Sequence, residues 1–289
     1  MEVLLPRTLE EALEIAASNP GVVPIAGGSD VMVELNMDLA HPETLMDVSR
    51  LPELREIRRE NGSLFLGSGV TYTRIMRELP GHTALVQASR SVGSPQIRNR
   101  GTVGGNLGTA SPAGDALPVL AAWGAEVVLG RAGGSTRSLP WREFVTGVKR
   151  TAREPGELIL GARWSVPRGP GSFSKIGTRN AMVIAVANLC LQLDEPTRSV
   201  RVALGSVAPT VVRAEAAEAF AAQALQDSGL WDDPRVHLGP DVIERFGELV
   251  AEAADPIDDV RGTSVYRRHA VEVMARRALG WALADRAAG

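Results

Sequence analysis

Apolar and polar residues follow two different periods in the N-terminal part of the chain. Apolar positions three and four residues apart after Thr8, with Glu11 completing a capping box, predict a helix. A short apolar run at residues 22–26 ends in two glycines, which predicts a strand entering a tight turn. Residues 44–48 predict another strand. Together these elements predict a small mixed lobe over residues 1–55.

The middle of the chain predicts strands and helices around one long glycine-rich stretch. Predicted strands cover residues 64–69, 125–129 and 158–166, and predicted helices cover residues 72–79, 85–92 and 115–123. Residues 101–114 follow neither period and predict a long loop. Loops of this length inside a compact domain are commonly functional, so the stretch is a candidate binding segment.

The C-terminal part begins after a predicted turn of two glycines and a proline at residues 169–171. Alternating runs at residues 187–193 and 200–207 predict a hairpin. Helical spacing then covers residues 213–226, 240–254 and 263–285. The predicted fold class is α+β. The predicted domains are 1–168, with subdomains of about 1–55 and 56–168, and 172–289.

Composition and charge exclude several classes of function for this chain. The 289 residues are 44% hydrophobic and 22% charged, with a net charge of -3, which is typical of a globular protein and unlike a basic nucleic-acid-binding domain. The single cysteine cannot hold an iron–sulfur cluster. No run of 18 apolar residues and no signal-peptide pattern is present, so we expect a cytoplasmic protein without membrane insertion.

The sequence contains no familiar catalytic motif. There is no phosphate-binding GxxxxGK[ST] segment and no GxSxG nucleophile motif. The glycines at 67 and 69 lack the third glycine of a dinucleotide fingerprint, because Tyr72 stands there. The four histidines have no metal-ligand spacing, and Cys190 lies in an apolar run typical of a buried, inert thiol. Any chemistry is therefore expected from a bound cofactor.

Two glycine-rich segments are the candidate cofactor site. Residues 25–30 read Ile-Ala-Gly-Gly-Ser-Asp, and glycines after a strand allow positive φ and a close approach of backbone amides to an anion. Residues 101–115 combine five glycines with small hydroxyl and amide side chains and end in Asp115. Backbone amides with Ser and Thr hydroxyls suit phosphates, and a carboxylate suits ribose hydroxyls. A structural role for each segment is the alternative.

Three motifs carry a family resemblance: AGGSD at residues 26–30, QIRNRGTVGGN at 96–106, and ASP at 110–112 followed by Asp115. They resemble the FAD-binding medium subunit of the molybdenum hydroxylases, the xanthine dehydrogenase and carbon monoxide dehydrogenase family. Supporting segments follow in the same order. These are residues 144–147, Thr151, Lys175 with Arg179, residues 205–210 and residues 258–262.

The resemblance implies an FAD-binding domain of the p-cresol methylhydroxylase type, made of two α+β subdomains, and a C-terminal domain of a small antiparallel sheet with helices. It assigns to FAD the residues Ile25, Ala26, Gly27, Gly28, Ser29, Asp30, Val31, Thr102, Gly104, Gly105, Asn106, Thr109, Asp115, Ile159 and Lys175. Residues 25–31 would hold the pyrophosphate from one side and residues 102–106 from the other, with positive φ expected at Gly105. Asp115 would bind ribose or ribityl hydroxyls, and Ile159 and Lys175 would line the flavin. For Lys175, a solvated surface lysine is the alternative.

The resemblance also implies partners. FAD would be bound non-covalently and would receive electrons from two [2Fe–2S] clusters on a small iron–sulfur subunit. The molybdenum cofactor would lie on a large subunit, where substrate is hydroxylated. This chain would contribute no catalytic residue and no metal ligand of its own.

One departure concerns the electron acceptor. NAD-linked relatives carry an acidic residue shortly after the equivalent of Lys175, whereas this chain has Arg179-Asn180-Ala181-Met182. The departure favours dyes or quinones over NAD as acceptors. Two alternatives to the electron-transfer subunit stay open: a self-sufficient flavin reductase of the same fold, and a non-redox nucleotide-binding module.

Overall fold

The computed structural model describes residues 1–288, and the chain divides into two compact units. Unit 1 comprises Met1–Glu78, Gly93–Ser111 and Gly124–Ser165; unit 2 comprises Leu79–Val92, Pro112–Trp123 and the chain from Val166 onward. Two helical segments that precede residue 168 therefore belong to unit 2. The domain limits derived from the sequence stay a prediction.

Unit 1 begins with a small parallel sheet. Its strands are β1 (Glu2–Leu4), β2 (Val23–Ile25) and β3 (Thr44–Asp47), in the order β1-β3-β2. Helix α1 (Leu9–Ser18) starts at the predicted cap, where the Glu11 amide donates to Thr8 Oγ1 at 3.1 Å. Helix α2 (Val31–Asn36) follows the first glycine turn. Because β2 ends at this turn, the sheet sets the position of the first candidate segment.

A five-stranded antiparallel sheet forms the rest of the unit 1 framework. Its order is β4-β5-β10-β6-β7, with β4 (Ile57–Glu60), β5 (Ser63–Gly67), β6 (Glu126–Gly130), β7 (Thr136–Pro140) and β10 (Leu158–Ser165). Around it lie α3 (Tyr72–Glu78), α5 (Pro95–Arg100), α6 (Val103–Thr109), α8 (Trp141–Phe144), and the pair β8 (Val145–Gly147) and β9 (Arg150–Thr151). Short 3-10 turns cover Glu53–Arg55 and Ala132–Gly134.

The predicted long loop over residues 101–114 is wrong, because half of it is helical. Helix α6 covers Val103–Thr109 and starts where Thr102 Oγ1 accepts the Gly105 amide at 3.0 Å. Three glycines hide this helix from sequence reasoning, since glycine is a poor helix former. Tertiary packing overrides that preference: α6 packs against β10, and the Gly104 amide donates to Ser68 O at 3.0 Å.

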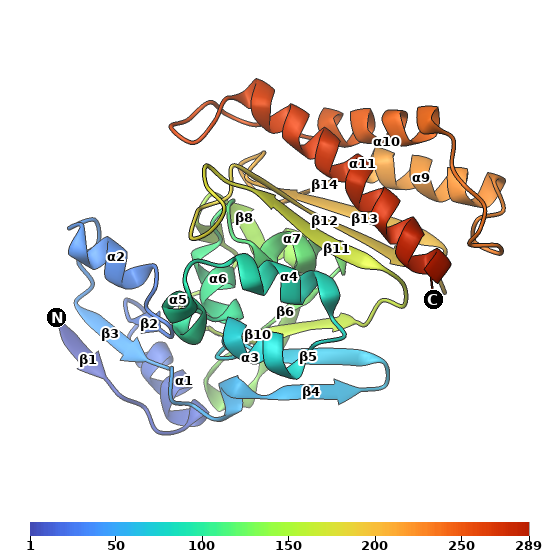
Figure 1. Cartoon of the computed structure of the whole chain (residues 1–289). Helices are drawn as coiled ribbons and strands as arrows, with labels where there is room; N and C mark the ends of the chain where they lie inside the picture. Colours follow the sequence, from blue (N-terminus) through green and yellow to red (C-terminus); the bar gives the residue numbers. More distant parts are fainter. Residues whose placement is uncertain (289) are drawn as a thin grey trace. The chain divides into compact units, whose positions relative to one another are not determined.

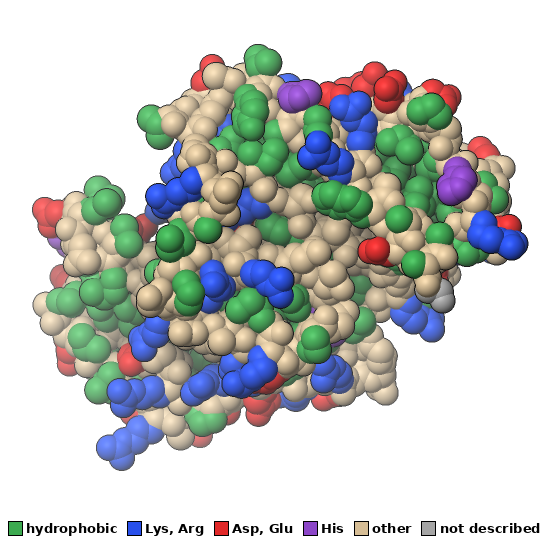
Figure 2. Space-filling view, viewed as in Figure 1, with side chains coloured by type: hydrophobic (Ala, Val, Ile, Leu, Met, Phe, Trp, Pro, Cys, Tyr) green, Lys and Arg blue, Asp and Glu red, His purple; other side chains and the backbone are tan. Residues whose placement is uncertain are grey.

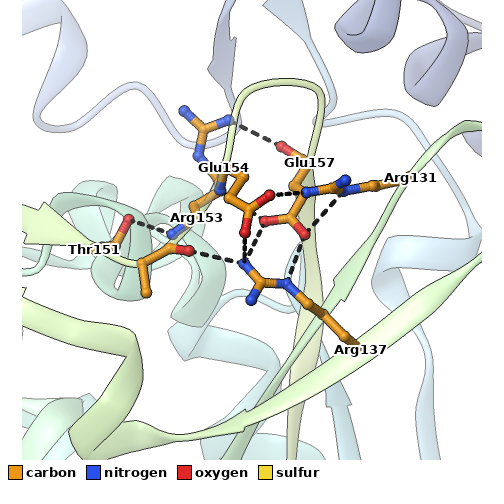
Figure 3. A network of polar contacts seen from close by, with 7 residues as sticks. Arg131, Arg137, Thr151, Arg153, Glu154 and Glu157 are labelled. Atoms are coloured by element: carbon orange, nitrogen blue, oxygen red, sulfur yellow. Dashed lines mark hydrogen bonds and ion pairs between the residues drawn. The ribbon is translucent and has the colours of Figure 1, made fainter.

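A buried carboxylate ties the edge of this sheet to the segment before β10 (Figure 3). Glu157, only 1% exposed, accepts hydrogen bonds from Arg131 Nε at 3.1 Å and from Arg137 Nε at 2.7 Å. Its other oxygen accepts from Arg137 and from the Glu154 amide. Burial alone would raise the pKa of Glu157, but Arg137, the Glu154 amide and Arg131 outweigh burial and lower it.

We expect Glu157→Gln to lower the free energy of unfolding by about 2 kcal/mol at pH 7, because charged hydrogen bonds to two arginines are lost. A lowered carboxyl pKa stabilises the folded state above the ordinary value of 4.5 and loses that effect as pH falls through the folded-state pKa. The difference between wild type and variant should therefore shrink below about pH 4.5. Denaturant titrations at pH 7 and pH 4 measure it, and a constant difference would contradict this role.

Unit 2 is built on a four-stranded antiparallel sheet (Figure 1). The order follows the sequence: β11 (Gly171–Ile176), β12 (Ala187–Asp194), β13 (Ser199–Gly205) and β14 (Val212–Arg213). Helices α4 (Thr83–Ser91) and α7 (Ala116–Ala122) pack on one face. Helices α9 (Glu215–Asp227) and α11 (Ser264–Ala288) pack on the other, and α10 (Pro240–Glu252) packs on both of them.

Strand β12 is buried on both faces. Leu189, Leu191 and Leu193 join the core beneath α9–α11, while Asn188 and Gln192 point the other way and bond residues at the two ends of α7. The predicted inert cysteine is confirmed: Cys190 is buried, and burial raises the pKa of its thiol. The polar side chains of β12 that these contacts involve, Asn188 and Gln192, therefore face the α4–α7 side of the sheet.

Two structural features are absent from residues 1–288. No helix there combines the length and apolar character needed to cross a membrane. No group of three or more His, Cys, Asp or Glu side chains in that part of the chain is arranged to hold a metal ion. Charged side chains of both signs are spread over the face of the molecule shown in Figure 2.

Candidate functional site

The first glycine turn is shaped by its two glycines in different ways. Gly28 has φ +74°, in the left-handed region that favours glycine. Gly27 is required by close packing, because a Cβ there would lie 2.2 Å from the Arg100 carbonyl oxygen. Within residues 1–288, no amide between Ile25 and Met32 donates to a backbone carbonyl. The turn therefore carries consecutive backbone donors that the chain itself leaves available.

The second glycine segment packs against Ser68, at the end of β5, through Gly104. A Cβ at Gly104 would lie 2.3 Å from the Ser68 Cβ, so only glycine lets α6 approach the end of β5 this closely. Gly105 and Gly108 differ from it, because both are exposed on α6. A Cβ at Gly105 would meet only the Thr102 hydroxyl, at 3.2 Å, and one at Gly108 only the Ile159 Cδ1, at 3.5 Å.

The structure brings these two segments together in unit 1. Thr109 Oγ1 donates to Asp30 Oδ2 at 2.8 Å, joining the end of α6 to the start of α2. Ile159 lies beside Gly108, since a Cβ added to Gly108 would be 3.5 Å from Ile159 Cδ1. Asn106 contributes a buried side-chain oxygen, Oδ1, that has no hydrogen-bond partner in the described chain. Residues from 25–31, 102–109 and 159 thus form one cluster, although they are far apart in sequence.

Unit 2 holds the remaining two predicted residues, and they form an ion pair. Lys175 on β11 lies 2.6 Å from Asp115, with exposed side-chain fractions of 10% and 6%. Lys175 is therefore largely covered and is not a solvated surface lysine. Its ammonium also donates to Ser91 O at 3.1 Å.

Two further side chains complete the surroundings of Asp115. Asn188 Nδ2 and Ser91 Oγ both donate to this carboxylate at 3.1 Å. Burial raises the pKa of Asp115, whereas the Lys175 ammonium and the three hydrogen bonds oppose that rise. The carboxylate is held by donors on α4, β11 and β12. Any hydroxyl that binds Asp115 would have to join or replace one of these donors.

Sequence reasoning missed several residues of these two clusters. Ser68 and the Arg100 carbonyl define the space around Gly104 and Gly27, while Ser91 and Asn188 surround Asp115. Only Asn188 left a signal, as a polar residue within a strongly apolar run. The positive φ expected at Gly105 is wrong, because Gly105 lies in the first turn of α6 and the left-handed glycine is Gly28.

Two family models together match most of the chain. The sequence profile of the FAD-binding domain in molybdopterin dehydrogenase matches residues 1–167. The profile of the CO dehydrogenase flavoprotein C-terminal domain matches residues 172–282. The chain belongs to the FAD-binding subunits of the molybdenum hydroxylase family. The resemblance stated from the motifs, and the fold class and FAD cofactor it implied, are confirmed.

Individual relatives and solved structures are similar to this chain over most of its length. The nicotinate dehydrogenase FAD-subunit of Eubacterium barkeri is 36% identical over 206 residues, covering 67% of this chain and 69% of that protein. The xanthine dehydrogenase FAD-binding subunit of Escherichia coli O157:H7 is 29% identical over 292 residues, covering 96% and 94%. The structure of a carbon monoxide dehydrogenase from Hydrogenophaga pseudoflava superimposes with a TM-score of 0.86 at 26% identity, covering 98% of this chain and 97% of that one.

Proposed function

We propose that this chain is the electron-transfer flavoprotein subunit of a molybdenum hydroxylase. In this proposal it receives electrons from [2Fe–2S] clusters of a small partner subunit and passes them to an external acceptor. Substrate would be oxidised at a molybdenum cofactor on a large partner subunit. The support is the family membership, together with relatives named as FAD subunits or medium chains of dehydrogenases. A cytoplasmic location stays a prediction.

One observation carries the FAD site: the two exposed glycines of α6. Each helical glycine costs about 1 kcal/mol relative to alanine. Gly27 and Gly104 are explained by close packing. A Cβ would meet only Ile159 Cδ1 at Gly108, at 3.5 Å, and only the Thr102 hydroxyl at Gly105, at 3.2 Å, so no backbone of this chain excludes a side chain from either position. A bound group that must approach the α6 backbone explains why these positions lack one. The unpartnered Asn106 Oδ1 lies in the same helix and points to the same conclusion.

Each cluster has its own proposed contacts with FAD. The free amides of residues 27–30, with Ser29, would hold the pyrophosphate from one side, and Thr102, Gly104, Gly105 and Asn106 would line the other. Thr109 and Asp30 join the two segments, and Ile159 would pack on the flavin. In unit 2, Asp115 would bind ribose or ribityl hydroxyls and Lys175 would lie beside the flavin. When bound, FAD supplies the redox chemistry, and the protein supplies binding, orientation and electrostatics.

We expect the purified chain to take up FAD and to release it on acid precipitation. Neither glycine segment contains a histidine, cysteine or tyrosine to which a flavin could be attached. Absorbance spectra of the supernatant and of the redissolved pellet measure the result. Yellow colour kept in the pellet would contradict non-covalent binding, and no flavin uptake at all would favour the nucleotide-binding alternative.

Kinetic measurements on the same purified protein distinguish an electron-transfer subunit from a self-sufficient reductase. Since the segment after Lys175 has no carboxylate before Asp194, we expect dyes or quinones to reoxidise the reduced flavin faster than NAD does. Stopped-flow reoxidation measures this. Turnover of an organic substrate by the chain alone at about 1 per second or more would support the reductase instead.

A further inference from the structure

Three elements of unit 2 meet at one buried arginine. Arg267, near the start of α11, is 4% exposed. Its Nη1 donates to Val186 O at 2.8 Å and to Ser206 O at 2.6 Å, and its Nη2 lies 2.5 Å from Asp259 Oδ1. Two segments that resemble the family, residues 205–210 and 258–262, thus share one guanidinium.

The two carbonyls lie just outside a row of residues that crosses the sheet. Lys175 on β11 pairs with Asn188 on β12, which pairs with Gly205 on β13. Lys175 and Asn188 both bond Asp115. Val186 precedes Asn188 by two residues, and Ser206 directly follows Gly205, so both border the row Lys175–Asn188–Gly205. Arg267 binds the carbonyls of both bordering residues.

Backbone hydrogen bonds connect each bordering residue to the ion pair. The Val186 amide donates to Ile176 O at 2.8 Å, next to Lys175. The Ser206 amide donates to Pro112 O at 2.8 Å, three residues before Asp115.

Ser206 adds an independent sign of constraint. It is a non-glycine residue at φ +63°, and its buried Oγ has no partner in the described chain. Such a conformation is unfavourable for a residue with a side chain and persists only where surrounding contacts impose it. Arg267 supplies that contact through the Ser206 carbonyl.

We propose that Arg267 is a positioning residue for the flavin site: it sets the register of Lys175 and Asn188 against Asp115 without touching the cofactor. The inference rests on the proposed function, since it takes Lys175 and Asp115 to face FAD. Asp259 holds the guanidinium in place and accepts the Arg261 amide at 2.8 Å. The turn at residues 258–262 therefore supports the site from outside.

The test compares Arg267 with a matched arginine on the same helix. Arg286 is 11% exposed and binds the carbonyls of Leu230 and Trp231, which follow α9 and lie in no strand of the sheet. We expect Arg267→Met to raise the Kd for FAD about tenfold and to shift the visible absorbance bands of the bound flavin, with Arg267→Lys recovering part of both. Arg286→Met should lower the unfolding temperature while leaving the Kd and the bands unchanged.

Each outcome decides the matter. A wild-type Kd and spectrum for Arg267→Met, or equal losses for Arg286→Met, would overturn the positioning role while leaving the FAD site intact. No flavin uptake by the wild type would overturn the proposed function as well. Should Arg267→Met fail to fold, Arg267→Lys and Asp259→Asn carry the test, and unchanged flavin bands in both would count against it.

Discussion

Gly105→Val is expected to abolish FAD binding in a protein that still folds. The change adds a branched side chain on the exposed face of α6, where the chain's own atoms offer only the Thr102 hydroxyl within 4 Å. Valine is a better helix former than glycine, so the free energy of unfolding should change by less than about 1 kcal/mol. Overpacking against the cofactor should weaken binding by up to about a hundredfold, enough for the purified variant to lose its flavin. Flavin fluorescence titration measures the affinity.

Two companion variants make the Gly105 result interpretable. A Cβ at Gly280 in α11 would have open space around it, with no heavy atom within 4 Å, so Gly280→Val adds the same side chain to a helix without affecting FAD. Gly104→Ala should instead destabilise the fold, because its Cβ would collide with Ser68. Normal flavin content in Gly105→Val would remove the basis for placing the pyrophosphate at α6.

Asp115→Ala is expected to cause the largest loss of stability among the residues assigned to FAD. It leaves the Lys175 ammonium, 10% exposed, without its carboxylate partner, and breaking such a buried pair costs about 3–5 kcal/mol. The unfolding temperature should fall by roughly 10 °C. The lost hydrogen bonds to FAD hydroxyls should also weaken binding about ten- to a hundredfold. Calorimetry and flavin titration measure the two effects.

A second ion pair in unit 2 serves as a control that distinguishes an effect on stability from an effect on FAD binding. Arg213 and Glu218 are 13% and 11% exposed and lie 2.5 Å apart in the same unit. Glu218→Ala should lower the unfolding temperature comparably and leave FAD affinity unchanged. In the Asp115→Ala background, Lys175→Met should restore part of the stability by removing the unpaired charge. An unfolding temperature unaffected by Asp115→Ala would show that this ion pair does not stabilise unit 2.

Local signals in the sequence were sufficient for much of the secondary structure. The capping box at Thr8, the β12–β13 hairpin and the three C-terminal helices were predicted to within a few residues, since each has a period or a cap that neighbouring residues alone produce. Strand β11 was not predicted. Its start at Gly171 lies in the glycine and proline cluster that indicated a turn.

The sequence by itself determined the family and the FAD cofactor, because motif residues and their order are properties of the chain alone. It is also the basis on which we propose the glycine segments as FAD-binding. Tertiary structure alone decided what each glycine does. Gly27 and Gly104 make room for distant backbone, Gly28 adopts positive φ, and Gly105 and Gly108 leave a helix face bare. It also decided that Lys175 is buried against Asp115, 60 residues away, with Asn188 beside it. Such pairings depend on which strands and helices pack together, and that long-range packing has no period in the sequence to reveal it.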